Sequence, residues 1–407
     1  MARTRTARLY PTDSERERAY LVGVELRGAN GRRSWSSMEE LALLARTAGA
    51  DVAGMTVQRL DRPNPAHYIG RGKLEELVAE RERLGYSIVI FDDELTPSQQ
   101  RTLEKALKVK VLDRTALILD IFAMRARTRE GRLQVDLAQS EYLLPRLAGQ
   151  WSHLERLGGR SGAPGAIGVR GPGETQLETD RRLVRNKIAR LKAEIERVRR
   201  HRALYRRRRA RTGVPVVALV GYTNAGKSTL MRALTSADVL VEDQLFATLD
   251  PVTRRMTLPS GAHALLTDTV GFIQKLPTQL VAAFRATLEE LADADMLLHV
   301  VDITHPDAAE RSQTVDDTLA DLGLAGKPRV VALNKIDRLV DREGRPVEGP
   351  EELGDLAADL QRRFPNAVLI SAERRWGLNT LIARVEETLV SAAASPAGFG
   401  QERWAAS

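Results

Sequence analysis

The chain has 407 residues, of which 43% are hydrophobic, with a formal net charge of +8 and no cysteine. This length allows two or three domains, each able to bury a core. The lack of cysteine excludes disulfides, thiolate zinc sites and thiol nucleophiles, and the histidines show no metal-ligand spacing. No run of about 18 apolar residues occurs and no signal-peptide pattern follows the N-terminal arginines, so we expect a cytoplasmic protein without membrane insertion.

A small α/β domain is predicted over residues 20–130, after a flexible tail at 1–19. Short apolar runs such as "YLVGVEL" and "SIVIFDD" alternate there with helical patterns such as "SMEELALLARTAG" and "TPSQQRTLEKALK". This alternation predicts a mainly parallel sheet. The segment "YIGRGKLEEL" is glycine-rich and basic, but it lacks the Lys-Ser/Thr ending of a phosphate loop, so we interpret it as the start of a helix and not as a second nucleotide site.

An antiparallel helical hairpin is predicted over residues 131–212. Two helical patterns flank the glycine-rich segment "GGRSGAPGAIGVRGPGETQ", and the second helix is expected from about Gln176 to Arg211. Apolar residues recur in that helix at helical spacing, as suits packing against one partner helix. They are Val184, Ile188, Leu191, Ile195 and Val198.

Positive charge is concentrated in this second helix. Between Arg181 and Arg211, fifteen Lys and Arg stand against two Glu, so the rest of the chain is acidic overall. A charge run can simply be a solvated helix face, but so strong an asymmetry favours a surface for RNA phosphates. The glycine-rich loop, with Arg160 and Arg170, is either an adaptable tip that reaches into RNA or a plain connector.

The domain predicted over residues 213–390 carries the chemistry. The apolar run "VPVVALV" is typical of a central parallel strand, and it leads into "GYTNAGKSTL", which matches the phosphate-loop pattern G-x-x-x-x-G-K-[ST]. In such a loop backbone N–H groups surround the phosphates, Lys227 reaches the β and γ oxygens and Ser228 ligates magnesium. The residues expected at the nucleotide are Gly221, Tyr222, Thr223, Asn224, Ala225, Gly226, Lys227, Ser228 and Thr229.

A second signature, "HALLTDTVG", is expected on the magnesium side. Asp268 should hold magnesium through water and the N–H of Gly271 can contact the γ-phosphate, with Thr269 and Val270 between them.

Two later strands end in signatures for the base. "RVVALNKID" supplies Asn334, Lys335 and Asp337, and the Asp337 carboxylate can accept from guanine N1–H and N2–H₂, donors that adenine lacks. "NAVLISAE" supplies a backbone to meet guanine O6, through Ser371, Ala372 and Glu373. All these signatures lie at carboxyl ends of predicted parallel strands, where ligands bind in doubly wound sheets.

A segment that closes over the γ-phosphate is expected between the phosphate loop and "DTVG". The stretch "QLFATLDPVTRR" offers Thr248 and Thr253 to complete magnesium coordination, and we favour Thr248, with Phe246 and Ala247 beside the nucleotide. The predicted magnesium ligands are Ser228, Thr248 and Asp268, and the predicted catalytic residues are Lys227, Thr248 and Gly271.

The chain resembles the HflX family, within the Obg-HflX group of translation-factor GTPases. "LFATLDP", "DTVGFI" and "NKID" carry the resemblance in the G domain, and "FDDELTPSQQRTLEKAL" and "RGPGETQLETDRRLVRNKI" carry it outside, so it covers about residues 20–390. It implies an HflX-type N-terminal domain and a Ras-like P-loop GTPase domain with a doubly wound, mainly parallel sheet. Members are bacterial GTPases that bind the large ribosomal subunit and its rRNA, and some separate stalled ribosomes.

Two features qualify what the resemblance implies. Many members carry a small C-terminal domain, for which the tail at 391–407 is too short, so functions of that domain are not expected here. Phe272 stands where Ras-like enzymes carry the glutamine that orients water, and such catalytic groups supply factors of roughly 10³ to 10⁵, so turnover of the free enzyme should be slow. Asn224 either helps hold a potassium ion in place of an arginine or stabilises the turn.

The resulting hypothesis is a monomeric GTPase that uses GTP/GDP and Mg²⁺ and binds the large ribosomal subunit in its GTP form. Ribosome-stimulated hydrolysis would then act in ribosome rescue, splitting or subunit biogenesis under stress. One alternative is a GTP-gated RNA-binding or scaffold protein in which hydrolysis is incidental. A metabolic P-loop kinase is disfavoured because the guanine signature is present.

Overall fold

The computed structural model describes residues 16–28, 31–147, 172–210, 213–235, 245–246, 250–275, 290–340 and 344–394, and the side chains of 31–33, 172–177 and 202–210 are not among them. Thr248 with Ala247, the loop carrying Arg160 and Arg170, and both predicted tails beyond these ranges lie outside the described residues. The chain divides into two compact units, one ending at Leu117 and one beginning at Ile118.

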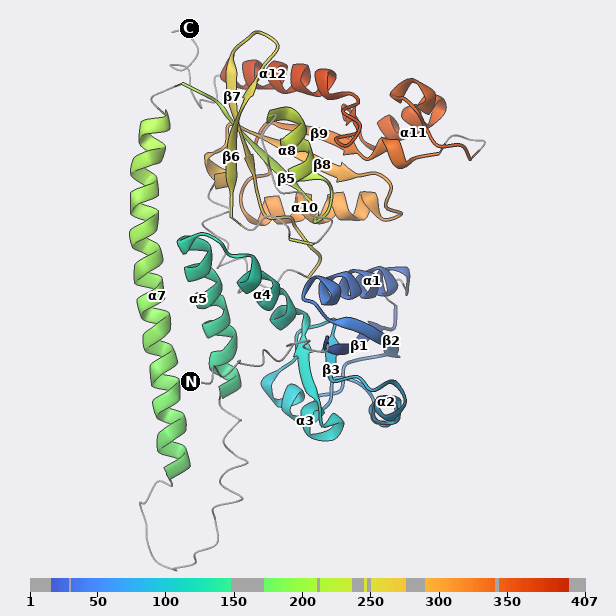
Figure 1. The fold of residues 1–407 in the computed structure, drawn as a ribbon, viewed down its shortest axis with the longest axis vertical. Coiled ribbons are helices and arrows are strands. Elements are labelled where there is room, and N and C mark those ends of the chain that lie inside the picture. The colour runs from blue at the N-terminus through green and yellow to red at the C-terminus, as the bar shows by residue number, and fades with distance from the viewer. Residues whose placement is uncertain are drawn as a thin grey trace, which may run out of the picture. The chain divides into compact units, whose positions relative to one another are not determined.

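The first unit is built on a four-stranded, wholly parallel sheet of order β2-β1-β3-β4. Its strands are β1 (Arg18–Leu26), β2 (Asp51–Leu60), β3 (Ile88–Phe91) and β4 (Lys110–Asp113). Helix α1 (Gly31–Thr47) lies on one face of the sheet, and α2 (Arg71–Leu84) and α3 (Pro97–Leu107) lie on the other (Figure 1). The predicted parallel α/β domain is confirmed, and "YIGRGKLEEL" does begin a helix, α2.

A buried ion cluster lies at the carboxyl edge of this first sheet. The Arg114 side chain is 2% exposed and its guanidinium donates to Asp92 Oδ1 at 2.7 Å and pairs with Glu40. Ser37 Oγ donates to Asp92 Oδ2 at 2.7 Å. Asp92, which follows β3, and Glu40, in α1, are therefore neutralised inside the unit.

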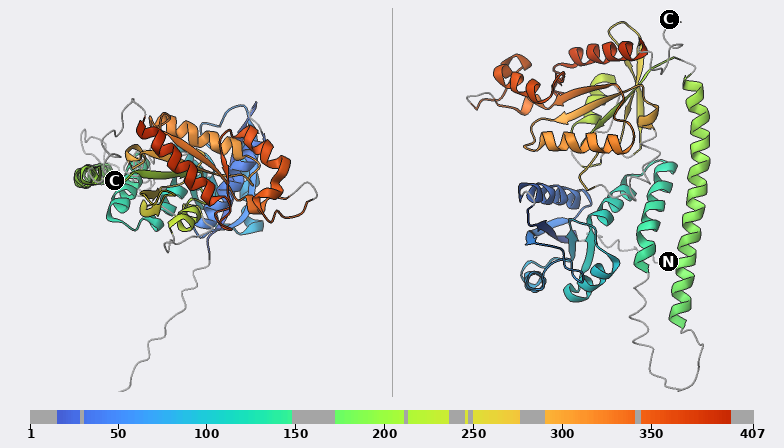
Figure 2. Two further views of the ribbon diagram at one scale, coloured as in Figure 1. Left: turned by 90° about the horizontal axis from the view of Figure 1, so that it is seen from above. Right: turned by 180° about the vertical axis from the view of Figure 1, so that it is seen from behind.

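Long helices open the second unit. Helix α4 (Arg114–Arg125) enters it, followed by α5 (Arg129–Arg146) and α7 (Pro172–Ala210). Helices α5 and α7 lie side by side in both Figures 1 and 2. Arg129 pairs with Glu194 at 3.7 Å and Asp136 with Lys187 at 3.9 Å, so the order of contacts is reversed along α7 and the helices are antiparallel.

The apolar stripe of α7 explains this pairing. Leu191 is 3% exposed and the other four predicted stripe residues are half-buried, as expected for one narrow seam between two helices. The predicted hairpin is therefore confirmed.

A six-stranded sheet of order β10-β9-β8-β5-β7-β6 follows, in which only β6 is antiparallel to its neighbour. Its strands are β5 (Val216–Gly221), β6 (Val252–Thr257), β7 (His263–Asp268), β8 (Met296–Asp302), β9 (Arg329–Asn334) and β10 (Val368–Leu369). Its helices are α8 (Lys227–Thr235), α10 (Ala308–Asp321), α11 (Gly354–Arg363) and α12 (Leu378–Ala394), with short 3₁₀ turns η2 (Ile336–Arg338) and η3 (Pro350–Leu353).

One apolar core joins α8 and α12 to the sheet, and α10 covers the opposite face (Figure 1). The central strand β5 is buried from Val217 to Gly221, which fits its wholly apolar sequence. This arrangement confirms the predicted doubly wound, mainly parallel sheet. Within the described residues, no helix combines the length and the apolarity needed to cross a bilayer.

Candidate functional site

The predicted phosphate loop joins the end of β5 to the start of α8. Gly226 has a φ of +94°, and a Cβ there would collide with Asn334 Nδ2, so the position requires glycine. The same Asn334 Nδ2 donates to Ala225 O at 2.9 Å. Asn334, at the end of β9, therefore supports the phosphate loop and links it to the base signature.

Lys227 lies inside this loop. Its side chain is buried and Nζ donates to Tyr222 O at 2.9 Å and Gly221 O at 3.1 Å. Burial lowers the pKa of Lys227 to about 8, and the negative charge of Asp268 opposes that shift. Phosphate oxygens next to the amine would stabilise its charged form in the same way.

The magnesium side brings together the predicted hydroxyl and carboxylate. Ser228 Oγ donates to Asp268 Oδ2 at 2.6 Å, and Asp268 is the last residue of β7. The alternative threonine, Thr253, lies in β6, where its Oγ1 is 3.0 Å from Thr267 Oγ1, so it is engaged between two strands. The preferred Thr248 is outside the described residues.

The base signature forms a connected network. Ala372 N donates to Asn334 Oδ1 at 3.0 Å, and Lys335 Nζ donates to Asp302 Oδ2 at 2.7 Å. Asp337 Oδ1 is buried and has no hydrogen-bond partner among the described residues. The structure thus leaves Asp337 Oδ1 without a donor among the described residues, whereas the amide of Ala372, predicted to meet guanine O6, is engaged with Asn334.

Some predicted contact residues have their polar groups engaged within the protein. Thr269 Oγ1 donates to Leu219 O at 2.6 Å and is buried. Ser371 Oγ accepts from Arg374 N at 2.9 Å, and Glu373 is exposed. The Thr269 and Ser371 side chains thus stabilise the backbone at these strand ends.

The "DTVGF" segment is hydrogen-bonded to the phosphate loop. Thr223 N donates to Phe272 O at 2.8 Å and Phe272 N donates to Gly221 O at 3.1 Å. Phe272 is 3% exposed, so its ring is packed inside the protein at the end of this segment. A Cβ on Gly271 would lie 2.8 Å from Thr223 Cα, so glycine permits this close approach.

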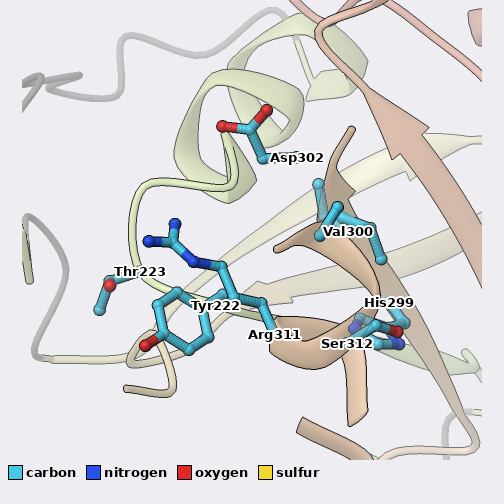
Figure 3. Close-up of a pocket in the computed structure, with 9 residues that line it drawn as sticks. Tyr222, Thr223, His299, Val300, Asp302, Arg311 and Ser312 are labelled. Carbon is cyan, nitrogen blue, oxygen red and sulfur yellow. The ribbon is translucent and has the colours of Figure 1, made fainter. Parts of the chain in front are cut away.

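Tyr222 was predicted at the nucleotide, but its side chain contacts the switch and α10. Gln274 N donates to Tyr222 Oη at 2.9 Å, and the Arg311 guanidinium lies 4.7 Å from the ring centroid. Figure 3 shows Arg311 beside the Tyr222 ring, with His299 also lining the small cavity between the loop, β8 and α10. Burial, followed by the charges of Arg329 and Lys227, lowers the pKa of His299 to about 3. His299 is therefore a neutral residue that lines the cavity.

Three residues at this site were not predicted from the sequence: Asp302, Gln274 and Arg311. Asp302 ends the apolar run "MLLHVVD", the same strand-then-acid pattern that identified Asp268, so that rule could have found it. Gln274 and Arg311 carry no local signal, because their contacts with Tyr222 join segments far apart in the sequence.

Groups suited to phosphate, magnesium and guanine meet at one edge of a doubly wound sheet, and this places the chain among the P-loop GTPases. Three family models match in order: the GTP-binding GTPase N-terminal region at 35–123, the GTP-binding GTPase middle region at 125–209 and the 50S ribosome-binding GTPase at 216–335. The chain belongs to the HflX family of GTPases, which confirms the resemblance seen in the sequence.

Individual relatives cover most of the chain. GTPase HflX of Caldanaerobacter subterraneus subsp. tengcongensis is 49% identical over 375 residues, spanning 92% of this chain and 81% of the relative. GTPase HflX of Escherichia coli is 43% identical over 357 residues, spanning 88% and 80%. Among solved structures, a GTP-binding protein from the archaeon Sulfolobus solfataricus in complex with GDP is 25% identical, with a TM-score of 0.45 and coverage of 92% and 99%.

Proposed function

We propose that this chain hydrolyses GTP, binds the large ribosomal subunit in its GTP form and is stimulated by the ribosome. The observation that carries the nucleotide assignment is the buried Asp337 Oδ1, which has no partner among the described residues. A buried acceptor without a donor is costly, and guanine N1–H and N2–H₂ are the donors that suit it. The description of the model matching residues 216–335, 50S ribosome-binding GTPase, supports the proposed partner.

Magnesium fits the Ser228 and Asp268 pair, because a hydroxyl and a carboxylate are the hard oxygen ligands that this ion prefers. We propose that these two residues and Thr248 hold it. Bound there, the ion would neutralise charge on the β and γ oxygens of the nucleotide.

The chain's own residues bind and orient the substrate. Lys227 holds its proton beside the phosphate oxygens, Gly271 offers its N–H, and Asp337 selects the base. Phe272 is buried and has no group that could orient a water molecule. Slow turnover of the free protein follows from that side chain, and the ribosome is the proposed source of acceleration.

Asn224 is the residue that would contact a second ion, potassium. It is exposed and has a φ of +61°, a left-handed conformation that asparagine tolerates, which supports its role as a turn residue. If potassium replaces an arginine, GTP turnover should be faster in potassium than in sodium at equal ionic strength, and Asn224→Ala should remove the difference. Equal rates in the two salts would leave only the turn role.

The proposed RNA surface is the solvent-facing side of α7. Seven basic side chains between residues 182 and 200 are exposed, and two of them, Lys187 and Lys192, also pair with Asp136 and Glu141 of α5. The seven are Arg182, Arg185, Lys187, Arg190, Lys192, Arg197 and Arg200. The helix is long and continuous in Figures 1 and 2, so these charges extend over a surface suited to a nucleic-acid backbone.

Cosedimentation of the full chain with separated ribosomal subunits tests this proposal. We expect binding to the large subunit with a non-hydrolysable GTP analogue and loss of binding with GDP, with an affinity that falls steeply as salt rises. Equal binding with both nucleotides would contradict GTP gating.

Replacing Arg206, Arg207, Arg208 and Arg209 by Gln should weaken binding and lower the salt dependence, while basal GTPase activity stays intact. A charge-matched control is the Gln replacement of Arg71, Arg83, Arg362 and Arg384, which are exposed elsewhere. If the first variant and a deletion of residues 160–170 both keep full stimulation by the ribosome, recognition resides in the N-terminal domain.

The alternative scaffold function predicts GTP-dependent binding without stimulated turnover, so the same samples assayed for phosphate release separate the two. We further propose a cytoplasmic monomer that acts in ribosome rescue, splitting or subunit biogenesis under stress. Family membership supports this role.

A further inference from the structure

Two described residues before β6, Phe246 and Asp250, contact the helices of the second unit. The first contact is aromatic: the rings of Phe246 and Phe122 have centroids 4.6 Å apart and planes at 72°, an edge-to-face contact. Phe246 is 2% exposed and Phe122, in α4, is fully buried. Phe246 is therefore held by apolar packing.

The second attachment is made by Asp250. Its Oδ2 accepts from the backbone N–H groups of Arg127 and Thr128, both at 2.8 Å, and its Oδ1 accepts from the Thr128 hydroxyl. Thr128 is also the N-cap of α5, since its Oγ1 accepts from Gly131 N at 3.0 Å. A carboxylate at the N-terminal end of a helix is favoured by the N–H groups and by the helix dipole.

These two contacts lie on either side of the predicted magnesium threonine, because Phe246 and Asp250 are each two residues from Thr248. We propose that Asp250 is a positioning residue for GTP hydrolysis: together with Phe246 it fixes to α4 and α5 the segment that presents Thr248 to the metal and the γ-phosphate. This inference rests on the proposed role of Thr248.

The contact also gives the proposed RNA surface a route to the nucleotide. Helix α5 packs along α7, and Arg129, one residue after the Asp250 contact, pairs with Glu194 on α7. A partner that shifts α7 would therefore act on the helix end that Asp250 caps. The RNA surface and the nucleotide site would then both act on the N-terminal end of α5. Energetic coupling between two sites requires such a shared element.

Loss of this attachment should affect the GTP state selectively. A segment that is no longer held in place must be ordered when Thr248 binds, and only the γ-phosphate form needs it there. We expect Asp250→Ala to lower kcat and the affinity for a GTP analogue by about tenfold, which corresponds to two or three hydrogen bonds of modest net strength. Affinity for GDP should stay within about twofold. Asp250→Asn keeps an acceptor oxygen and should be intermediate.

Gly131→Ala is the sharper variant. A Cβ at this position would collide with Asp250 Oδ1, although position 131 lies inside α5, where alanine is the better helix former. We therefore expect the same selective loss of GTP-analogue affinity and kcat without a fall in Tm, which a merely structural role would not produce. Gly72→Ala is the matched control, because a Cβ in helix α2 at Gly72 meets nothing within 4 Å.

Thr248→Ala separates this inference from the proposed function. If Thr248→Ala keeps wild-type turnover, the proposed role of Thr248 fails and the inference fails with it. If Thr248→Ala abolishes turnover while Asp250→Ala and Gly131→Ala both behave as wild type, the proposed function stands and the positioning role of Asp250 is overturned. Faster turnover in either variant would also overturn it, because the contact would then restrain the switch.

Discussion

The two mainly parallel sheets of this chain differ in how the protein engages the acidic groups at their carboxyl edges. In the first unit, Asp92, which follows β3, and Glu40, which lies in α1, are neutralised internally by the buried Arg114. In the G domain, the corresponding edge leaves the buried Asp337 Oδ1 without a partner among the described residues. An acid near the end of a strand therefore indicates a binding site where no group of the protein engages it, as at Asp337, whereas Asp302 at the end of β8 is paired with Lys335.

Removing the internal cation should have the largest effect. Arg114→Met leaves Asp92 and Glu40 buried without their partner, which typically costs about 3–5 kcal/mol of unfolding free energy. Denaturant unfolding of the full chain would show it, whereas Arg71→Met, at a side chain 89% exposed, should change stability by less than about 1 kcal/mol. A stable Arg114→Met protein that has lost GTP hydrolysis would instead make the cluster functional and break the contrast between the edges.

Replacing Asp337 of the G domain should alter nucleotide specificity and leave the free energy of unfolding unchanged. We expect Asp337→Asn to weaken GTP binding by a factor on the order of 10³, because the amide nitrogen meets the guanine donors, and to improve binding of xanthosine triphosphate, whose 2-oxo group replaces the amino group. Titrations with both nucleotides measure this exchange. Unchanged affinity for GTP would remove Asp337 from the base site.

The pH dependence of nucleotide affinity tests the role of Lys227 at the same edge of the G-domain sheet. Burial holds the pKa of Lys227 near 8, while bound phosphates favour the protonated amine, so binding takes up a proton when the pH exceeds about 8. Affinity for GDP should be full below that pH and fall by up to about tenfold per pH unit above it. Titrations between about pH 7 and 9.5 test this. The pH dependence should disappear in Lys227→Met, and a flat profile in the wild type would contradict it.

The smallest expected effect concerns the hydrogen bond between Gln274, just after "DTVGF", and Tyr222 of the phosphate loop. Tyr222→Phe removes the hydrogen bond from Gln274 N but keeps the ring beside Arg311. Loss of one such bond, worth about 1 kcal/mol, should lower kcat about fivefold with GDP affinity unchanged. Single-turnover rates and GDP titrations measure both effects. If GDP affinity falls as much as kcat, Tyr222 contacts the nucleotide, as the sequence predicts.

Much of this site is visible in the sequence because its parts are local. A phosphate loop is defined by glycines and Lys227 within a few residues, and Asp268 and Asn334 each end an apolar run that predicts a buried strand. The helical hairpin is also readable, since its apolar stripe recurs every three or four residues.

The contacts that connect these parts could not be read in the same way. Asp250 and Thr128 are 122 residues apart, and neither lies in a pattern that selects the other. Likewise, a tyrosine inside a phosphate loop suggests a ligand contact, and only the fold shows that its hydroxyl meets Gln274. Such pairings depend on tertiary packing, so local sequence does not determine them.

The most direct test of this account is GTP turnover by the full chain, measured alone and with purified large ribosomal subunits under the same ionic conditions. Because Phe272 supplies no group to orient water, we predict slow hydrolysis by the free protein and an increase of at least about tenfold on addition of large subunits, with no increase from small subunits. Rapid hydrolysis by the free protein, or a rate that large subunits leave unchanged, would contradict it.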